Sequence, residues 1–112
     1  MISSLPLTLT DAAAALRSGS VTSVGLTEAA IDRAVKLDDK LGVYLARFDE
    51  YALASAATAD AELASGTDRG ALHGIPLGVK DILAMAEGPT TAQSLILDPE
   101  WGKGKEIGRA HV

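Results

Sequence analysis

Three stretches of the chain carry apolar and small residues at the spacing of an α-helix. The first spans residues 8–18: Thr8 can serve as an N-cap, an acidic residue follows three positions later, and Gly19 is typical of a helix end. The second begins at a cap, Ser23, and runs to about Leu37. Its apolar positions predict one buried face, made of Val24, Ala30, Ile31, Ala34 and Val35.

The third stretch predicts a helix from a cap at Asp49 to about Ser65, where Gly66 provides the stop. Its faces are made mostly of small residues, which permit close approach to another helix. These residues are Leu53, Ala56, Ala57, Ala61, Leu63 and Ala64.

Two shorter segments have the patterns of β-strands. Residues 41–48 form a short apolar run that suits a buried strand, although a run this short is also compatible with a helix. Residues 72–81 alternate, and alternate side chains of a strand share a face. One face carries Ile75, Leu77 and Val79, and the other carries Pro76, Gly78 and Lys80. The lysine therefore shares its face with almost no side-chain bulk.

Composition limits the classes of function. The chain has 112 residues, of which 47% are hydrophobic, enough for one modest core and so for one domain or part of one. The formal net charge is -5 and no basic run occurs, so we expect neither nucleic-acid binding nor association with anionic membranes. The absence of cysteine excludes disulfides, thiolate nucleophiles and Cys-containing metal sites.

The amino-terminal residues do not resemble a secretory signal. The sequence MISSLPLTLT has no basic region and no uninterrupted apolar region. No stretch of the chain approaches the roughly 20 apolar residues that span a bilayer. We therefore expect a soluble, cytoplasmic protein.

Lys80 is the candidate catalytic residue. Burying an ammonium group is costly unless the group is paired or gives up its proton. Removal from water favours the neutral amine, and a neutral amine can deprotonate a serine hydroxyl. Gly74 and Gly78 would leave room for other catalytic loops to approach it. The alternative is that Lys80 ends an edge strand and pairs in solvent with Asp81 or another carboxylate.

The sequence GALHGIPLGVKDI at residues 70–82, followed by PTTAQS at residues 89–94, resembles the lysine-bearing block of the amidase-signature family. The likeness extends from the first predicted helix to about Lys105. It implies an α/β fold, a mixed β-sheet covered by α-helices, to which residues 1–105 contribute the N-terminal helices and the first strands of an incomplete amidase domain. It also implies that Lys80 belongs to a Ser–cis-Ser–Lys triad that hydrolyses an amide bond.

By the same resemblance, the two serines and the oxyanion hole belong to a Gly/Ser-rich block downstream of the lysine. No such block occurs between Ser94 and Val112, so neither serine is assigned and the chain alone is expected to be inactive. The substrate is expected to be a small linear amide, and no cofactor or metal is expected. The sequence does not indicate an oligomeric state.

Other candidates have ordinary interpretations beside the functional ones. Asp81 could orient Lys80, but adjacent strand residues point to opposite faces, so a structural hydrogen bond fits equally well. His73 could be an acid or a metal ligand, but His111 is the only other histidine, which argues against a metal site. Small hydroxyl residues after Gly-Pro could line a pocket but are commonly turn formers; they are Thr90, Thr91 and Ser94.

The last seven residues, 106–112 (EIGRAHV), fall outside the resemblance. The codons ATC GGA AGA GCA CAC GTC, from the start of a widely used sequencing adaptor, translate as Ile-Gly-Arg-Ala-His-Val and are followed there by the stop TGA. We therefore expect a non-native tail produced by read-through into adaptor, and a genuine helix end is the alternative. A stop after Val112 in independently sequenced genomic DNA would overturn this expectation.

Three functions remain open on the sequence alone. The first is an amidase, a hydrolase of carbon–nitrogen bonds in linear amides, of which this chain is an amino-terminal fragment. The second is the glutamine-hydrolysing A subunit of the tRNA-dependent amidotransferase, which resembles the chain over the same block. The third, of another class, is a small helical interaction module without catalytic activity.

Overall fold

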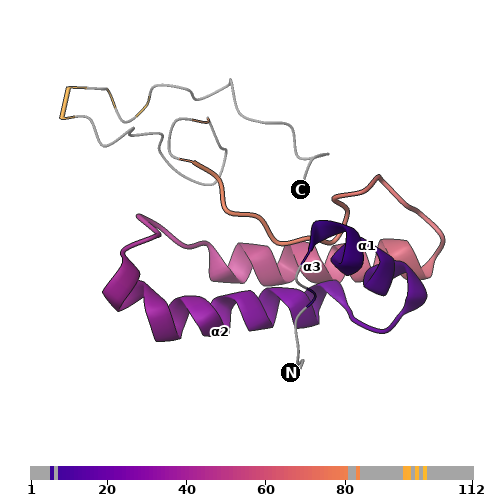
Figure 1. Cartoon of the computed structure of the whole chain (residues 1–112). Coiled ribbons are helices and arrows are strands. Elements are labelled where there is room, and N and C mark those ends of the chain that lie inside the picture. The colour runs from indigo at the N-terminus through magenta and orange to yellow at the C-terminus, as the bar shows by residue number, and fades with distance from the viewer. Residues whose placement is uncertain are drawn as a thin grey trace. The chain divides into compact units, whose positions relative to one another are not determined.

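The computed structural model describes residues 6, 8–80, 83, 95, 96, 98 and 100. In this part of the chain it contains three α-helices, α1 (Leu9–Ser18), α2 (Ser23–Leu41) and α3 (Asp49–Ala64), shown in Figure 1. The chain divides into two compact units, of which the first ends at Pro76 and the second begins at Leu77. The helices and the loop that follows α3 belong to the first unit, and Lys80 belongs to the second.

Helix α1 begins and ends as its local sequence predicts. Thr8 is the N-cap, and its side-chain oxygen accepts a hydrogen bond of 3.0 Å from the backbone N–H of Asp11. Gly19 ends the helix with φ of 79°, in the left-handed region, and its N–H donates to carbonyls of the last turn. The predicted short helix is therefore confirmed.

Helix α2 differs from its prediction at both ends. The N-cap is Thr22, whose side-chain oxygen accepts from the N–H of Gly25, while Ser23 lies inside the helix. The helix continues to Leu41, four residues past the predicted end, and stops at Gly42, where φ is 60°. The apolar periodicity fades after Leu37, but nothing in the next four residues breaks a helix, so it continues to the first glycine.

Helix α3 occupies the predicted stretch, but Asp49 is not its cap. Phe48 takes the N-cap position and makes no side-chain hydrogen bond. Asp49 and Glu50 lie in the first turn, where their negative charge interacts favourably with the helix dipole. Ser65 caps the end of the helix, one residue before Gly66. The acidic residue therefore stabilises the helix start through charge rather than as the capping side chain.

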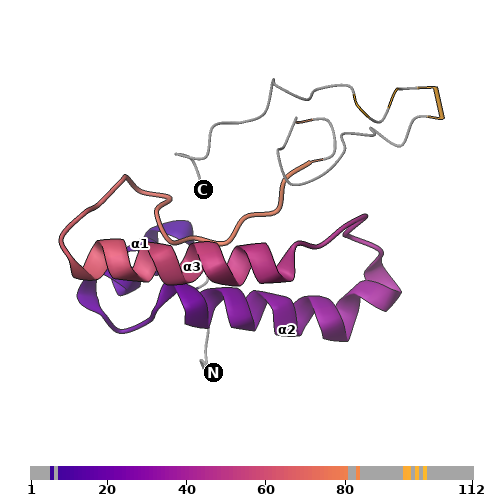
Figure 2. The ribbon, with the colours of Figure 1, turned by 180° about the vertical axis from the view of Figure 1, so that it is seen from behind.

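Helices α2 and α3 lie side by side in antiparallel directions, as the opposite views in Figures 1 and 2 show. The buried residues of α2 all lie between Ser23 and Ala29. Ala30 and Val35, predicted to belong to the buried face, are exposed, Val35 at 61%. Ile31 and Ala34 are half-buried, so the apolar periodicity of the later turns corresponds to partial burial rather than to a buried face.

The core of the first unit is small and lies where the three helices meet. Ala12 and Leu16 of α1 cluster with Leu26 of α2. Partly buried apolar side chains from α3 and the loops pack against this cluster, namely Val21, Leu63 and Ile75. The inclusion of Ile75 is important for the site, because it ties the start of the lysine-bearing segment to the helices.

Neither predicted strand is present among the described residues. Residues 42–48 form an irregular connection between α2 and α3, and residues 75–80 have no regular secondary structure. A strand requires a neighbour whose N–H and C=O groups complete its ladder, and no such neighbour occurs in the described part of the chain. The strand predictions for residues 41–48 and 72–81 are therefore wrong for this structure, although residue 81 itself lies outside the described residues.

Exposed apolar side chains gather at the connection between α2 and α3. They are Leu37, Leu41, Val43, Tyr44, Leu45, Phe48 and Tyr51. Several are large and more than half exposed, Leu41 at 65% and Leu45 at 64%. A patch of this kind is unusual on a self-sufficient monomer.

The isolated 112-residue chain is therefore expected to bind a dye such as anilinonaphthalene sulfonate and to lose its helical circular dichroism gradually on heating, without a sharp transition. Size-exclusion chromatography is expected to show aggregation. A monodisperse chain that unfolds in one cooperative step would contradict this expectation and would favour the interaction-module hypothesis.

Candidate active site

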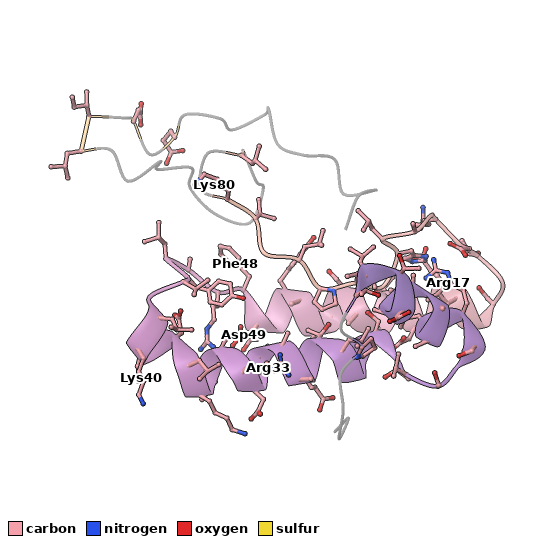
Figure 3. All side chains as sticks on the ribbon, in the orientation of Figure 1. Arg17, Arg33, Lys40, Phe48, Asp49 and Lys80 are labelled. Atoms are coloured by element: carbon pink, nitrogen blue, oxygen red, sulfur yellow. The ribbon has the colours of Figure 1, made fainter. Side chains whose placement is uncertain are left out.

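Lys80 closes the continuous described stretch 8–80, and its side chain is exposed (Figure 3). Its carbonyl accepts a hydrogen bond of 3.0 Å from the N–H of Leu83. A Cβ built at Gly78 would meet no atom of the described structure within 4 Å, so the glycine does leave open space two residues before the lysine. The predicted burial of the amine is not found in this structure, because no strand or loop of the described residues covers Lys80.

Asp81, Thr90, Thr91, Ser94 and His111 lie outside the described residues, and so does the tail 106–112. Among the residues that are described, no cluster of three metal-ligating side chains occurs.

His73 is the predicted site residue that the structure places most clearly. It is only 4% exposed, in the loop that joins α3 to the lysine-bearing segment. The backbone N–H of Arg69 donates to Nδ1 at 3.1 Å, so Nδ1 must be unprotonated, and the ring proton then lies on Nε2, 3.2 Å from Oε1 of Glu62. One ring nitrogen is bonded within the loop and the other to Glu62 of α3, so in this structure His73 is a buried structural residue.

Arg17 of α1 also binds this loop, beside which it is labelled in Figure 3. Its guanidinium donates to both carboxylate oxygens of Asp68, at 2.8 and 3.0 Å. It also donates to two backbone carbonyls of the loop, those of Gly70 at 2.6 Å and His73 at 3.4 Å. One side chain of α1 therefore fixes three points of a loop more than 50 residues away in sequence.

Ser23, at the start of α2, supplies a third attachment. Its hydroxyl donates to the carbonyl of Gly74 at 2.7 Å, and the residue is 2% exposed. Its own position is set by Asp60 of α3, whose carboxylate accepts from the N–H groups of Ser23 and Val24 at 2.7 and 3.1 Å. Asp60 thereby serves two of the free N–H groups at the start of α2.

We call Arg17, Ser23 and His73 the loop clamp. From the sequence, His73 was considered for a different role, Ser23 was predicted only as a helix cap, and Arg17 was not singled out. Arg17 and Ser23 bond mainly to backbone carbonyls far away in sequence, and no local motif marks such a partnership. Glu62 and Asp60 appear in the sequence as ordinary polar positions of an amphipathic helix.

The charges around the loop lower the pKa values of its carboxyl groups. Hydrogen bonds from Arg17 and from the N–H of Gly70 lower the pKa of Asp68 from 3.8 to about 2. The hydrogen bond from Arg69 lowers the pKa of Glu62, and the contact with His73 adds to the effect. Both carboxylates are therefore charged over the ordinary pH range.

The Asp68 shift can be measured directly. Because the folded-state pKa is below the ordinary value, the carboxylate's contribution to stability is complete above about pH 4 and is lost as the pH falls toward 2. Titration followed by the carboxyl carbon signal of Asp68 should give a midpoint near 2, and Arg17→Ala should return it most of the way toward 3.8. A midpoint unchanged by the substitution would mean that Arg17 does not hold the loop in solution.

Comparison with known proteins identifies the family. The family model described as Amidase matches residues 25–103, a range that contains Lys80. The chain belongs to the amidase family. Membership implies the α/β fold expected from the resemblance, whereas the described residues supply three helices of it.

Individual relatives carry two kinds of name. AmiD of Mycobacterium tuberculosis, named as a putative amidase, is 41% identical over 90 residues, 80% of this chain and 19% of its own length. The A subunit of the glutamyl-tRNA(Gln) amidotransferase of Renibacterium salmoninarum is 43% identical over 86 residues, 77% of this chain and 16% of its own. The corresponding protein of Jannaschia sp. is 44% identical over 110 residues, 91% of this chain and 22% of its own.

The chain spans about a fifth of the length of these relatives. No solved structure matches it. In the described part of the chain, no helix is both long and apolar enough to cross a membrane.

Proposed function

We propose that this chain is the amino-terminal part of an enzyme that hydrolyses the carbon–nitrogen bond of a small linear amide. The observation that carries the proposal is the family match over residues 25–103, within which Lys80 stands in the Gly-Val-Lys-Asp segment of the lysine-bearing block. The 41% sequence identity to AmiD over 80% of this chain supports it. Lys80 is the amine of a Ser–cis-Ser–Lys triad in this proposal.

The reaction requires a proton to move from the attacking serine to the lysine and a proton to move from the lysine to the leaving nitrogen. The nucleophilic serine attacks the amide carbon, and its proton passes through the cis-peptide serine to the neutral amine of Lys80. The resulting ammonium returns a proton to the leaving nitrogen, the C–N bond breaks, and an acyl-enzyme remains. Water then attacks the acyl-enzyme ester, its proton follows the same relay, and the acid leaves as the serine is restored.

The amine must be neutral at the moment of attack. Removal from water favours the neutral form of a lysine, and in the described chain Lys80 is exposed. We propose that the remaining segments of the enzyme, which include the Gly/Ser-rich block with the two serines and the oxyanion hole, cover it. Without those segments the 112-residue chain lacks both nucleophile and oxyanion donors and does not turn over amides.

A second candidate is the glutamine-hydrolysing subunit of a tRNA-dependent amidotransferase. The observation that favours it is the 44% identity to a protein of that name over 91% of this chain. The two candidates share the triad and differ in the fate of the ammonia: an amidase releases it into solution, whereas an amidotransferase passes it to an acyl group on tRNA.

The complete protein separates these candidates. We expect it to release ammonia from simple aliphatic or aromatic amides without any partner, and to form a hydroxamate when hydroxylamine intercepts the acyl-enzyme. The 112-residue chain serves as the inactive control. If glutamine were the one amide hydrolysed, and partner subunits and charged tRNA stimulated the reaction, the result would favour the amidotransferase. Failure to form a hydroxamate with any amide would contradict the acyl-enzyme mechanism.

A further inference from the structure

The end of the α2–α3 pair presents an apolar surface that no described residue covers. It comprises the end of α2, the connection and the start of α3, and the labels of Lys40 and Phe48 mark this end of the helices in Figure 3. Its exposed apolar residues are Leu37, Leu41, Val43, Tyr44, Leu45, Phe48 and Tyr51. We call this surface the apolar apex.

The apolar apex is large for a surface that faces water. Its three aromatic residues are between 36% and 44% exposed, and a whole aromatic side chain buries roughly 200 Å², so these three alone leave roughly 200 Å² in water. Leu41, Val43 and Leu45 are each exposed over more than half of their surface and add to this area. Contiguous apolar patches larger than a few hundred Å² are rare on monomeric soluble proteins and mark interaction surfaces.

Charged side chains beside the apex already have partners within the first unit. The carboxylate of Asp38 accepts from the backbone N–H groups of Val43 and Tyr44, at 2.7 and 3.1 Å. The guanidinium of Arg47 lies 3.8 Å from the carboxylate of Asp49. Because these charges are paired internally, the apex offers a partner mainly apolar side chains. Its occupant must therefore present an apolar face, since an unpaired charge buried there would be costly.

The family match indicates what this occupant is. The matched range, residues 25–103, includes the whole apolar apex. Membership implies an α/β fold, in which helices bury their apolar faces against a sheet, whereas the described residues supply helices and no strand. The chain also spans only about a fifth of the length of its relatives. Most of the apolar surface of such a domain therefore lies in the part of it that this chain does not contain.

We propose that the apolar apex is the surface on which the part of the amidase domain absent from this chain packs. The contact is intramolecular in the complete protein and attaches the helical unit through the end of the α2–α3 pair. The inference rests on family membership and on the exposed apex, and it does not depend on the catalytic role proposed for Lys80. The competing occupants are a second copy of the protein and residues 77–111 of this chain.

Photo-crosslinking in the complete protein identifies the occupant. The photoreactive residue p-benzoylphenylalanine is introduced in place of Tyr44, within the apex. The matched control carries it in place of Lys36 of α2, whose side chain is 69% exposed and paired with Asp32. After illumination, the cross-linked peptides are identified by mass spectrometry. The Tyr44 position should give intramolecular cross-links to peptides that follow residue 112, and the Lys36 position should give few or none.

Hydroxyl-radical footprinting of the unmodified complete protein makes the test independent of the introduced residue. If the apex is covered, the rings of Tyr44, Phe48 and Tyr51 should be oxidised at least about tenfold more slowly in the native protein than in urea, where the chain is unfolded. The exposure found in this structure would slow their oxidation only about twofold to threefold. The protection should not change on dilution, because the contact is within one polypeptide.

Three results would overturn the inference. Cross-links from the Tyr44 position to a second copy, with protection that is lost on dilution, would make the apex an interface between copies. Cross-links confined to residues 77–111 would mean that this chain covers its own apex. Absence of cross-links, with oxidation slowed only twofold to threefold, would mean that the apex stays in water. Amide turnover by Lys80→Ala tests the proposed function separately, so either proposal can fail without the other.

Discussion

Replacing Lys80 with alanine in the complete protein is expected to lower kcat for amide hydrolysis by roughly a hundredfold to ten-thousandfold, with little change in KM. In the proposed mechanism the amine takes the proton of the attacking serine and returns it to the leaving nitrogen, and both transfers occur in or near the transition state. Substrate binding before those transfers does not require the amine. The measurement is steady-state ammonia release, with far-UV circular dichroism to verify that the variant is folded.

Lys80→Arg tests whether the site needs a base or only a positive charge. A guanidinium keeps the positive charge and most of the length of lysine but cannot be deprotonated in a protein. If the lysine acts by transferring protons, the arginine variant should be about as slow as the alanine variant. Lys40→Ala, which removes an exposed lysine from the last turn of α2, should keep full activity. Substantial turnover by Lys80→Arg would show that the site needs a charge rather than a base.

The helices could be predicted from the sequence because their determinants are local. Thr8 and Gly19 begin and end α1 through contacts within a few residues, and those contacts are present as expected. The end of α2 was predicted four residues too early. Amphipathic periodicity indicates which positions are buried, whereas the helix ends where Gly42 stops it. Periodicity and stop signals coincide in α1 and differ by four residues in α2.

The strands could not be verified by local reasoning, because a strand is a relation between two segments. Val43 and Leu45 have strand-like patterning yet are exposed at 63% and 64%. Their pattern is that of a buried strand, which requires a second strand or a helix to cover it. No described residue provides that cover. The family match explains the pattern, since membership implies a sheet, while the described chain contributes helices.

The residues of the candidate site also fall into two groups: one marked by a local sequence block, and others whose partners are distant in sequence. Lys80 was predicted as the catalytic residue because a short contiguous block resembles a family block, and that role stays a prediction. The loop clamp was not found, because Arg17 and Ser23 meet the loop 51 residues or more away and bind its carbonyls, which every residue type possesses. His73 was noticed as a histidine but its role was not, because the partners that fix its ring, Glu62 and the N–H of Arg69, come from the helix and loop that precede it.

Gly74 is the point at which these long-range contacts depend on a single residue type. Its φ of 89° lies in the left-handed region, and an added Cβ would be 3.1 Å from Leu16 Cδ1, 3.5 Å from Ser23 Cβ and 3.6 Å from Leu63 Cδ1. Leu16 is only 6% exposed and cannot move aside without disturbing the core. Backbone strain and crowding therefore act together at this position.

Gly74→Ala is accordingly expected to lower the free energy of unfolding of the complete protein by about 2–5 kcal/mol, roughly 1–2 from the left-handed backbone and 1–3 from overpacking. Gly19→Ala is the matched control, because Gly19 has φ of 79° and no atom within 4 Å of an added Cβ, so only the backbone cost of about 1–2 kcal/mol applies. Urea denaturation of the two variants measures the difference. Equal destabilisation by the two substitutions would mean that Leu16 gives way freely and that the close approach of loop and helix does not constrain the fold.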